Sequence, residues 1–268
     1  MEEPILIAAF YKFVPLPDYR EMRGPLLRAC HAAGLRGTIL LAREGINATI
    51  AGTRAAVETM ISCLRADPRL GDLMVKESFH NCIPFGRMKV RLKREIVAMK
   101  VPGIDPNKQV GAYVEPTDWN RLIAQDDLLL LDARNDYEAR MGSFPRSLNP
   151  ETGAFHELPR FIDDNLDPQR HKRVAMFCTG GIRCEKATAY LLAQGFPEVY
   201  HLRGGILNYL ATGEPAESLW QGECFVFDER VSLDQRLQKG RIVICDDCKA
   251  VVNVNDAECP HCGSGSLL

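Results

Sequence analysis

The chain has 268 residues, of which 46% are hydrophobic and 25% charged, and its formal net charge is −2 at pH 7. This length suffices for two compact domains and a small appendage. No stretch reaches the roughly 18 consecutive apolar residues of a membrane span, and the start Met-Glu-Glu-Pro lacks the basic and apolar segments of a secretion signal. We therefore expect a cytoplasmic protein without membrane contact, and we interpret its ten cysteines as reduced thiols.

Residues 1–100 have the pattern of a β-α-β-β-α-β domain. The predicted strands are Ile5–Phe13, Leu35–Ala42, Ile46–Ala51 and Met88–Ile96, and the predicted helices are Asp18–Ala33 and Thr53–Ala66. A hairpin-like turn at residues 43–45 joins the two middle strands. This order predicts a ferredoxin-like fold similar to acylphosphatase. A further apolar stretch, Leu73–Phe79, could form an additional strand, for which the pattern offers no place.

Positive charge is concentrated in these first 100 residues. They hold 16 Lys and Arg against 10 Asp and Glu, a net charge of +6, whereas the remainder carries −8. Within the last predicted strand, cations alternate with apolar residues, as in a strand with one face in the core. The cations are Arg87, Lys89, Arg91, Lys93 and Arg94. Such a row can follow the phosphates of RNA, and a solvated edge strand that resists aggregation is the alternative.

The second half of the chain alternates strands with helices. Residues 101–115 are predicted to be a linker, and residues 116–215 a domain that opens with a capped helix at Pro116. Its predicted elements are the strands Leu128–Asp132, Val174–Phe177 and Val199–Leu202 and the helices near Asp136–Met141 and at Ile182–Gln194. This alternation predicts a parallel α/β sheet with helices on both faces and reactive groups at the carboxyl ends of its strands.

The chain ends with two further predicted segments. Residues 216–240 are predicted to be a crossing segment, whose Trp220 and Phe225–Asp228 we expect to pack against the other domain. Residues 241–268 carry two Cys-x-x-Cys pairs, made of Cys245, Cys248, Cys259 and Cys262. Four thiolates at this spacing suit tetrahedral zinc and predict a zinc-ribbon-like tail with a structural zinc site. Incidental cysteines or a redox pair are alternatives, and His261 is expected to be a ligand only in a Cys₃His variant of the site.

Cys178 lies where a short apolar strand ends and a glycine-containing turn opens into a helix. The unpaired N–H groups and partial positive charge of a helix N-terminus favour an anion, and they can lower the pKa of a cysteine below its ordinary value of about 8.5. Cys178 is therefore the predicted nucleophile or oxidisable thiolate, with a cysteine that merely packs as the alternative. The loop predicted to form an anion nest around it is Thr179, Gly180, Gly181, Ile182 and Arg183.

Spacing relates this loop to a known fold. Four residues separate Cys178 from Arg183, which resembles the loop of the rhodaneses, whereas cysteine-dependent phosphatases have five. The strand that ends in Asp132-Ala-Arg134 and the helix start at Gly204-Gly205 are similar to two other rhodanese motifs in the same order. The resemblance implies a rhodanese-like catalytic domain over residues 116–215.

Neighbouring residues are expected to support the loop. Gly180 and Gly181 are expected to provide its backbone angles, and Arg183 to orient it and bind an anionic group. Asp132 and Arg134 are predicted to brace it by hydrogen bonds rather than to touch substrate. Three other residues have two interpretations each. Cys184 could trap oxidised Cys178 as a disulfide or be a small buried helix residue, and Lys186 and Arg203 could add positive potential or be solvated.

A narrower resemblance covers nearly the whole chain. It is carried by Phe177–Lys186, Arg134–Glu138, Glu44–Asn47 and Leu219–Asp228. Together these stretches are similar to the bacterial rhodanese-like tRNA uridine hydroxylases, the TrhO family. The resemblance implies an oxidoreductase of the monooxygenase type that converts the wobble uridine of tRNA to 5-hydroxyuridine. It also implies molecular oxygen as co-substrate, tRNA as partner and an essential Cys178.

The sequence carries no signature of a redox cofactor. It has no Gly-x-Gly-x-x-Gly turn after a strand, and its six histidines form no clear two-His-one-carboxylate set, so neither flavin nor iron is predicted. A covalent route, in which a thiolate adds to the pyrimidine ring and activates the neighbouring carbon, is a hypothesis. Three functions are ranked: the tRNA hydroxylase, a rhodanese-type sulfurtransferase with a persulfide on Cys178, and a non-catalytic RNA-binding or scaffold protein.

Overall fold

The computed structural model of the protein describes residues 3–248, 250–256 and 258–265. It divides into two units, Met1–Ala98 and Met99–Leu268. Parts of the predicted first domain, residues 1–2, and of the predicted tail, residues 249, 257 and 266–268, lie outside the described residues. Within the described ranges, no helix has both the length and the apolar character that crossing a membrane would require.

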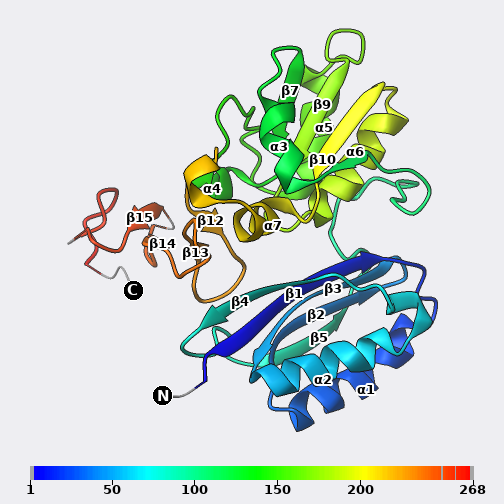
Figure 1. The fold of residues 1–268 in the computed structure, drawn as a ribbon, viewed down its shortest axis with the longest axis vertical. Helices are drawn as coiled ribbons and strands as arrows, with labels where there is room; N and C mark the ends of the chain where they lie inside the picture. The colour runs from blue at the N-terminus through cyan, green and yellow to red at the C-terminus, as the bar shows by residue number, and fades with distance from the viewer. Residues whose placement is uncertain (1–2, 249, 257, 266–268) are drawn as a thin grey trace. The chain divides into compact units, whose positions relative to one another are not determined.

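The first unit is a five-stranded sheet with two helices on one face (Figure 1). Its elements are β1 (Ile5–Phe13), α1 (Tyr19–Ala32), β2 (Arg36–Ala42), β3 (Gly45–Gly52), α2 (Arg54–Arg65), the short helix η1 (Pro68–Leu70), β4 (Val75–His80) and β5 (Met88–Leu92). Successive side chains of a strand point to opposite faces, and in β1 Leu6, Ala8 and Phe10 belong to the core under the helices. The predicted ferredoxin-like fold is confirmed.

One strand assignment is wrong. The strand order is β4-β1-β3-β2-β5, so β4, which pairs antiparallel with β1, completes the ferredoxin-like set. The stretch predicted as the fourth strand, Met88–Ile96, instead forms the added edge strand β5, which is parallel to β2 and ends at Leu92. Alternation of apolar and polar residues indicates a strand but does not say which edge of a sheet it joins, so the sequence could not separate the two.

The alternating pattern of β5 is present. Met88 and Val90 are buried in the core, whereas Lys89 is half-buried and Arg91 is exposed. Arg87, Lys93 and Arg94, which flank the strand, are exposed as well. The five cations therefore lie along or beside an edge strand, in the arrangement that both sequence interpretations require.

The second unit contains a four-stranded parallel sheet in the order β6-β10-β9-β7 (Figure 1). These strands are β6 (Ala112–Val114), β7 (Leu128–Asp132), β9 (Arg173–Phe177) and β10 (Glu198–Leu202). The helices are α3 (Pro116–Ile123), α4 (Asp136–Ala139), α5 (Leu158–Asn165), α6 (Ile182–Ala193) and α7 (Gly205–Thr212), with short helices η2 (Phe155–Glu157) and η3 (Pro215–Glu217). Ala175 and Phe177 share a core with side chains of α3 and α7.

Two elements of the second unit, the strand β6 and the helix α5, were not predicted from the sequence. Residues 112–114, assigned there to the linker, form the edge strand β6. The helix α5, which packs beside α6, was not predicted. Both elements are short, and short elements carry too few turns or alternations to give a clear period.

The crossing segment packs within the second unit. Its short strands are β11 (Gln221–Gly222), which pairs with β8 (Gly142–Ser143), and β12 (Cys224–Phe225), which pairs with β13 (Ser232–Leu233). Trp220 is 1% exposed and lies edge-on to Phe144, with ring centres 5.1 Å apart. Phe225 likewise contacts Tyr137 of its own unit, and the expected packing of Trp220 and Phe225–Asp228 against the other domain stays a prediction. The tail adds the hairpin β14 (Ile242–Ile244) and β15 (Val251–Asn253).

Candidate active site

Cys178 follows the last residue of β9, and α6 begins four residues later. Of the two loop glycines, Gly181 has a positive φ of 98° and caps α6, whereas Gly180 has no positive φ. Only Gly181 therefore needs the conformational freedom of glycine. Its N–H lies 3.1 Å from the Cys178 sulfur. The backbone amide and the thiol of Cys184 donate to the same sulfur, so Cys184 belongs to the group that surrounds it.

This surrounding sets the charge of Cys178, which is fully buried. Burial opposes ionisation, but the Cys184 thiol, the charge of Arg183 and the amides of Cys184 and Gly181 together lower the pKa of Cys178 to about 5. Burial and donation to Cys178 raise the pKa of Cys184 well above its ordinary value. The two sulfurs thus form a thiolate that accepts and a thiol that donates.

The low pKa gives a testable titration. A thiol that ionises at about 5 is almost entirely thiolate at neutral pH and is protonated as the pH falls below 5. The difference in thiolate ultraviolet absorbance between the intact protein and Cys178→Ser should therefore have its midpoint near pH 5. Cys30→Ser is the control, since burial raises the pKa of Cys30 to about 11. A Cys178 midpoint in the ordinary thiol range would contradict the geometry.

Arg183 and Glu138 form a buried ion pair behind the loop. The two terminal nitrogens of Arg183 lie 2.6 and 2.7 Å from the two carboxylate oxygens of Glu138. The Thr179 hydroxyl also donates to Glu138, at 3.2 Å. Burial raises the pKa of Glu138, but the charge and hydrogen bonds of Arg183 outweigh it and keep the pKa below its usual value. Arg183 is thus held by a carboxylate of this chain, which orients the loop.

Sequence reasoning did not single out Glu138 as a site residue. It lies 45 positions before Arg183, and no local spacing connects the two. One observation could have indicated Glu138 as a site residue: it ends the stretch Arg134–Glu138, which is one of the stretches that resemble the TrhO family. At the start of α4 its carboxylate also accepts the N–H of Asn135, at 3.2 Å.

Asp132 and Arg134 form a second buried ion pair, with a shortest distance of 2.6 Å. Arg134 also donates to the carbonyl oxygens of Glu138, at 3.1 Å, and Gly142, at 2.6 Å. Its guanidinium lies over the rings of Phe177 and Trp220. Neither side chain is exposed. Through these hydrogen bonds the pair holds the backbone at Glu138, whose side chain binds the loop residue Arg183.

The start of α7 holds the loop from the other side. The N–H of Ile206 donates to the carbonyl of Cys178 at 3.0 Å, and that of Leu207 to the carbonyl of Thr179 at 3.1 Å. These are first-turn N–H groups, which have no partner within their own helix. Gly205 permits this approach because a Cβ there would lie 2.4 Å from the Cys178 carbonyl oxygen.

Lys186 and Arg203, the two cations predicted either to add positive potential or to be solvated, both have contacts within the protein. Lys186 is 2% exposed, on the buried side of α6. Arg203 forms an ion pair with Glu115, and its guanidinium lies 4.3 Å from the centre of the Tyr113 ring.

The four tail cysteines come together as predicted. Their sulfur atoms lie within 4.8 Å of one another, with 3.7 Å between Cys245 and Cys262 and 3.6 Å between Cys248 and Cys259. Tetrahedral Zn–S bonds of about 2.3 Å imply sulfurs roughly 3.8 Å apart, which the cluster fits. It could therefore hold a metal such as zinc. His261 is not part of this cluster.

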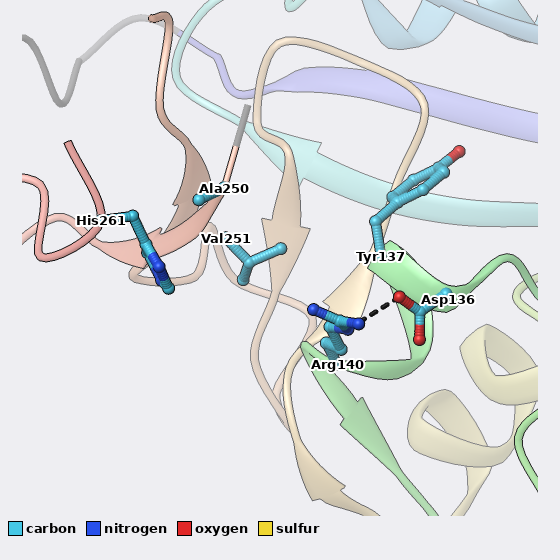
Figure 2. A pocket seen from close by; sticks show the side chains of 6 residues that line it. All are labelled: Asp136, Tyr137, Arg140, Ala250, Val251 and His261. Atoms are coloured by element: carbon cyan, nitrogen blue, oxygen red, sulfur yellow. Dashed lines mark ion pairs between the residues drawn. The ribbon is translucent and has the colours of Figure 1, made fainter. Parts of the chain in front are cut away.

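His261 instead lines a cavity of about 430 Å³ between the tail and α4 (Figure 2). The cavity is lined by Asp136, Tyr137, Arg140, Ala250, Val251 and His261. Asp136 and Arg140 form an ion pair at 2.7 Å. The cavity lining includes no residue of the Cys178 loop.

Comparison with known proteins defines the class. Residues 5–96 match the UPF0176 acylphosphatase like domain, and residues 115–212 match the Rhodanese-like domain. The protein therefore combines an acylphosphatase-like domain with a rhodanese-like domain that carries Cys178. This combination is the domain architecture of the UPF0176 proteins, also called TrhO.

Solved structures resemble parts of the chain. A rhodanese-related protein from Thermoplasma volcanium is 25% identical over 39% of this chain and 95% of its own, with a TM-score of 0.31. A possible tyrosine phosphatase of unknown function from Rhodopseudomonas palustris is 24% identical over 41% and 86%, with a TM-score of 0.33. The rhodanese-like domain of an Anabaena protein is 20% identical over 41% and 78%, with a TM-score of 0.34. Scores this low carry no functional argument.

Proposed function

We propose that the protein is a cytoplasmic tRNA-modifying oxidoreductase that converts the wobble uridine to 5-hydroxyuridine, with molecular oxygen as co-substrate and Cys178 as the reacting thiolate. The proposal is carried by one observation: a buried thiolate, held by Gly181, Cys184 and Arg183, in a chain with the UPF0176 domain architecture. A rhodanese-like domain alone is shared by several activities, and the family resemblance narrows the choice.

The thiolate supports a covalent route. Addition of the Cys178 sulfur to C6 of the uracil ring would form an S–C bond and place negative charge on C5, the carbon that is hydroxylated. One oxygen atom then enters at C5 and the other leaves as water, which consumes two electrons and two protons from an external reductant. Release of the sulfur and loss of the C5 proton restore the ring. A low pKa is what such a nucleophile needs at neutral pH.

Isotope labelling tests this reaction. Cells that lack the gene should lose 5-hydroxyuridine from their tRNA, and the intact chain should restore it. Grown under isotopically heavy oxygen gas, the complemented cells should carry the heavy isotope in the new hydroxyl group, as nucleoside mass spectrometry would measure. Restored hydroxyuridine whose oxygen comes from water would overturn the monooxygenase assignment.

A sulfurtransferase is the second candidate, favoured by the four-residue spacing between Cys178 and Arg183. In that activity Cys178 would carry a persulfide and pass its outer sulfur to an acceptor. Thiocyanate release from thiosulfate and cyanide measures it directly. Release that disappears in Cys178→Ser, together with unchanged tRNA hydroxyuridine in the deletion strain, would favour this candidate.

The edge strand β5 is the proposed binding surface for tRNA phosphates. Replacing Lys89, Arg91 and Lys93 by Gln should weaken tRNA binding and reduce the slope of log K against log salt by about 0.7–0.9 for each phosphate that the protein no longer neutralises. The control is Arg28→Gln, an exposed cation on α1. Filter binding at several salt concentrations measures the slope, and an unchanged slope in the triple variant would place the RNA-binding surface elsewhere.

We also propose that the tail cluster holds a structural zinc. The tail has a small core made of Val243, Val252, Cys245 and Cys259, so metal ligation would supply much of its stability. Cys259→Ser should lower the zinc content from about one per chain to near zero and expose the tail to proteolysis. Metal analysis checks this, with the exposed Cys63→Ser as control. Equal zinc in both variants would contradict the site.

A further inference from the structure

An exposed aromatic ring lies beside the thiolate loop. Phe227, in the turn between β12 and β13, is 63% exposed, although phenylalanine is mostly buried in folded proteins. Its ring centre lies 4.9 Å from that of Phe225 in an edge-to-face contact. Phe225 in turn lies edge-on to Tyr137, at 5.2 Å. Phe227 is thus the exposed end of a row of three aromatic rings.

The turn that carries Phe227 is fixed by buried contacts. Asp228 and Arg230 form an ion pair at 2.6 Å, and their side chains are 2% and 3% exposed. The backbone closes the turn, since the N–H of Val226 donates to the carbonyl of Val231 at 2.8 Å. These contacts hold the turn in place and keep the Phe227 ring exposed. An apolar ring that the fold holds in solvent suggests a binding role.

Arg183 connects this ring to the reacting sulfur. Its guanidinium carbon lies 5.7 Å from the centre of the Phe227 ring, and its charge acts on the thiolate of Cys178. At the other end of the row, Tyr137 precedes Glu138, the partner of Arg183. The ion pair between Arg183 and Glu138 therefore lies next to both the aromatic row and the Cys178 thiolate.

We propose that Phe227 is the stacking surface for the pyrimidine base that reacts at Cys178, with Phe225 and Tyr137 as its support. The inference rests on the proposed function and adds the residue that positions the substrate base. A nucleobase fits because its flat ring stacks on a single aromatic face. Protein-binding surfaces are marked by contiguous apolar patches larger than a few hundred Å², whereas Phe227 is the one exposed ring of the three, since Phe225 is 7% exposed and Tyr137 is half-buried.

The test asks whether the contribution of the wobble base to binding depends on the Phe227 ring. Two anticodon stem-loop RNAs are compared, one with uridine at the wobble position and one with an abasic site there. Binding to the full chain is measured for the intact protein, Phe227→Ala and Phe227→Trp. The matched control is Phe79→Ala, since Phe79 is 37% exposed and has the Arg54 guanidinium 5.4 Å from its ring centre, in the other unit.

The intact protein should bind the uridine RNA about 5- to 100-fold more tightly than the abasic RNA. Phe227→Ala should remove this preference, whereas Phe227→Trp and Phe79→Ala should keep it. If Phe227→Ala keeps the preference, the stacking role is overturned and the hydroxylase proposal stands. If the intact protein binds neither RNA, both proposals fail.

Discussion

Glu138→Ala is expected to destabilise the second unit by about 3–5 kcal/mol, because it leaves the guanidinium of Arg183 buried without its partner. Both side chains are nearly inaccessible, at 7% exposure for Arg183 and 0% for Glu138. Thr179 would lose a hydrogen bond to the same carboxylate, so the loop should become mobile as well. Urea unfolding of the variant, followed by near-ultraviolet circular dichroism, measures the loss.

An exposed pair of the same unit provides the control. Asp164 and Arg160 lie 3.4 Å apart on α5, with their side chains 61% and 88% exposed. Removing Asp164 should change stability far less, since exposed ion pairs are screened by water. Equal losses for Glu138→Ala and Asp164→Ala would show that the Glu138 pair does not hold the loop.

Gly205→Ala is expected to displace the thiolate loop. A Cβ at this position would lie 2.4 Å from the carbonyl oxygen of Cys178 and 2.7 Å from the N–H nitrogen of Gly181, and the φ of +70° is itself unfavourable for alanine. The strain costs about 1–3 kcal/mol, and the overlap adds about the same or more. Because Gly181 donates to the sulfur, its displacement should also raise the pKa of Cys178.

Gly195→Ala separates the two contributions. Gly195 has a φ of +88°, but nothing lies within 4 Å of its added Cβ. It should therefore lose stability through strain alone and leave the thiolate titration near pH 5. If Gly205→Ala and Gly195→Ala behave alike in stability and titration, the contact between α7 and the loop is not what holds Cys178.

The sequence indicated Cys178 more readily than the residues that hold it. Cys178, Gly181 and the start of α6 are adjacent in the chain, so one local pattern of strand, glycine turn and helix indicated them all. Glu138 and Gly205 reach the loop only through the fold, and local spacing contains no sign of either contact. Cys184 was noticed for possible disulfide chemistry, whereas its hydrogen bond to the thiolate depends on the geometry of the first helical turn.

In the fold, too, the sequence predicted what depends on neighbouring residues and missed what depends on pairing between distant segments. Periodicity identified β1, β2, β3 and both helices of the first unit, because each is long enough to repeat its pattern several times. Met88–Ile96 was assigned the position that β4 occupies, and Leu73–Phe79 had no position, since pairing depends on which sheet edge is open. The three residues of β6 pair with β10, far along the chain, and carry no pattern of their own.

The most direct test of the account is nucleoside mass spectrometry of tRNA from a deletion strain that expresses either the intact protein or Cys178→Ser. We predict that the intact protein restores 5-hydroxyuridine and that the serine variant, expressed at an equal level, does not. Full restoration by Cys178→Ser would contradict the central claim that the thiolate held in this loop performs the reaction.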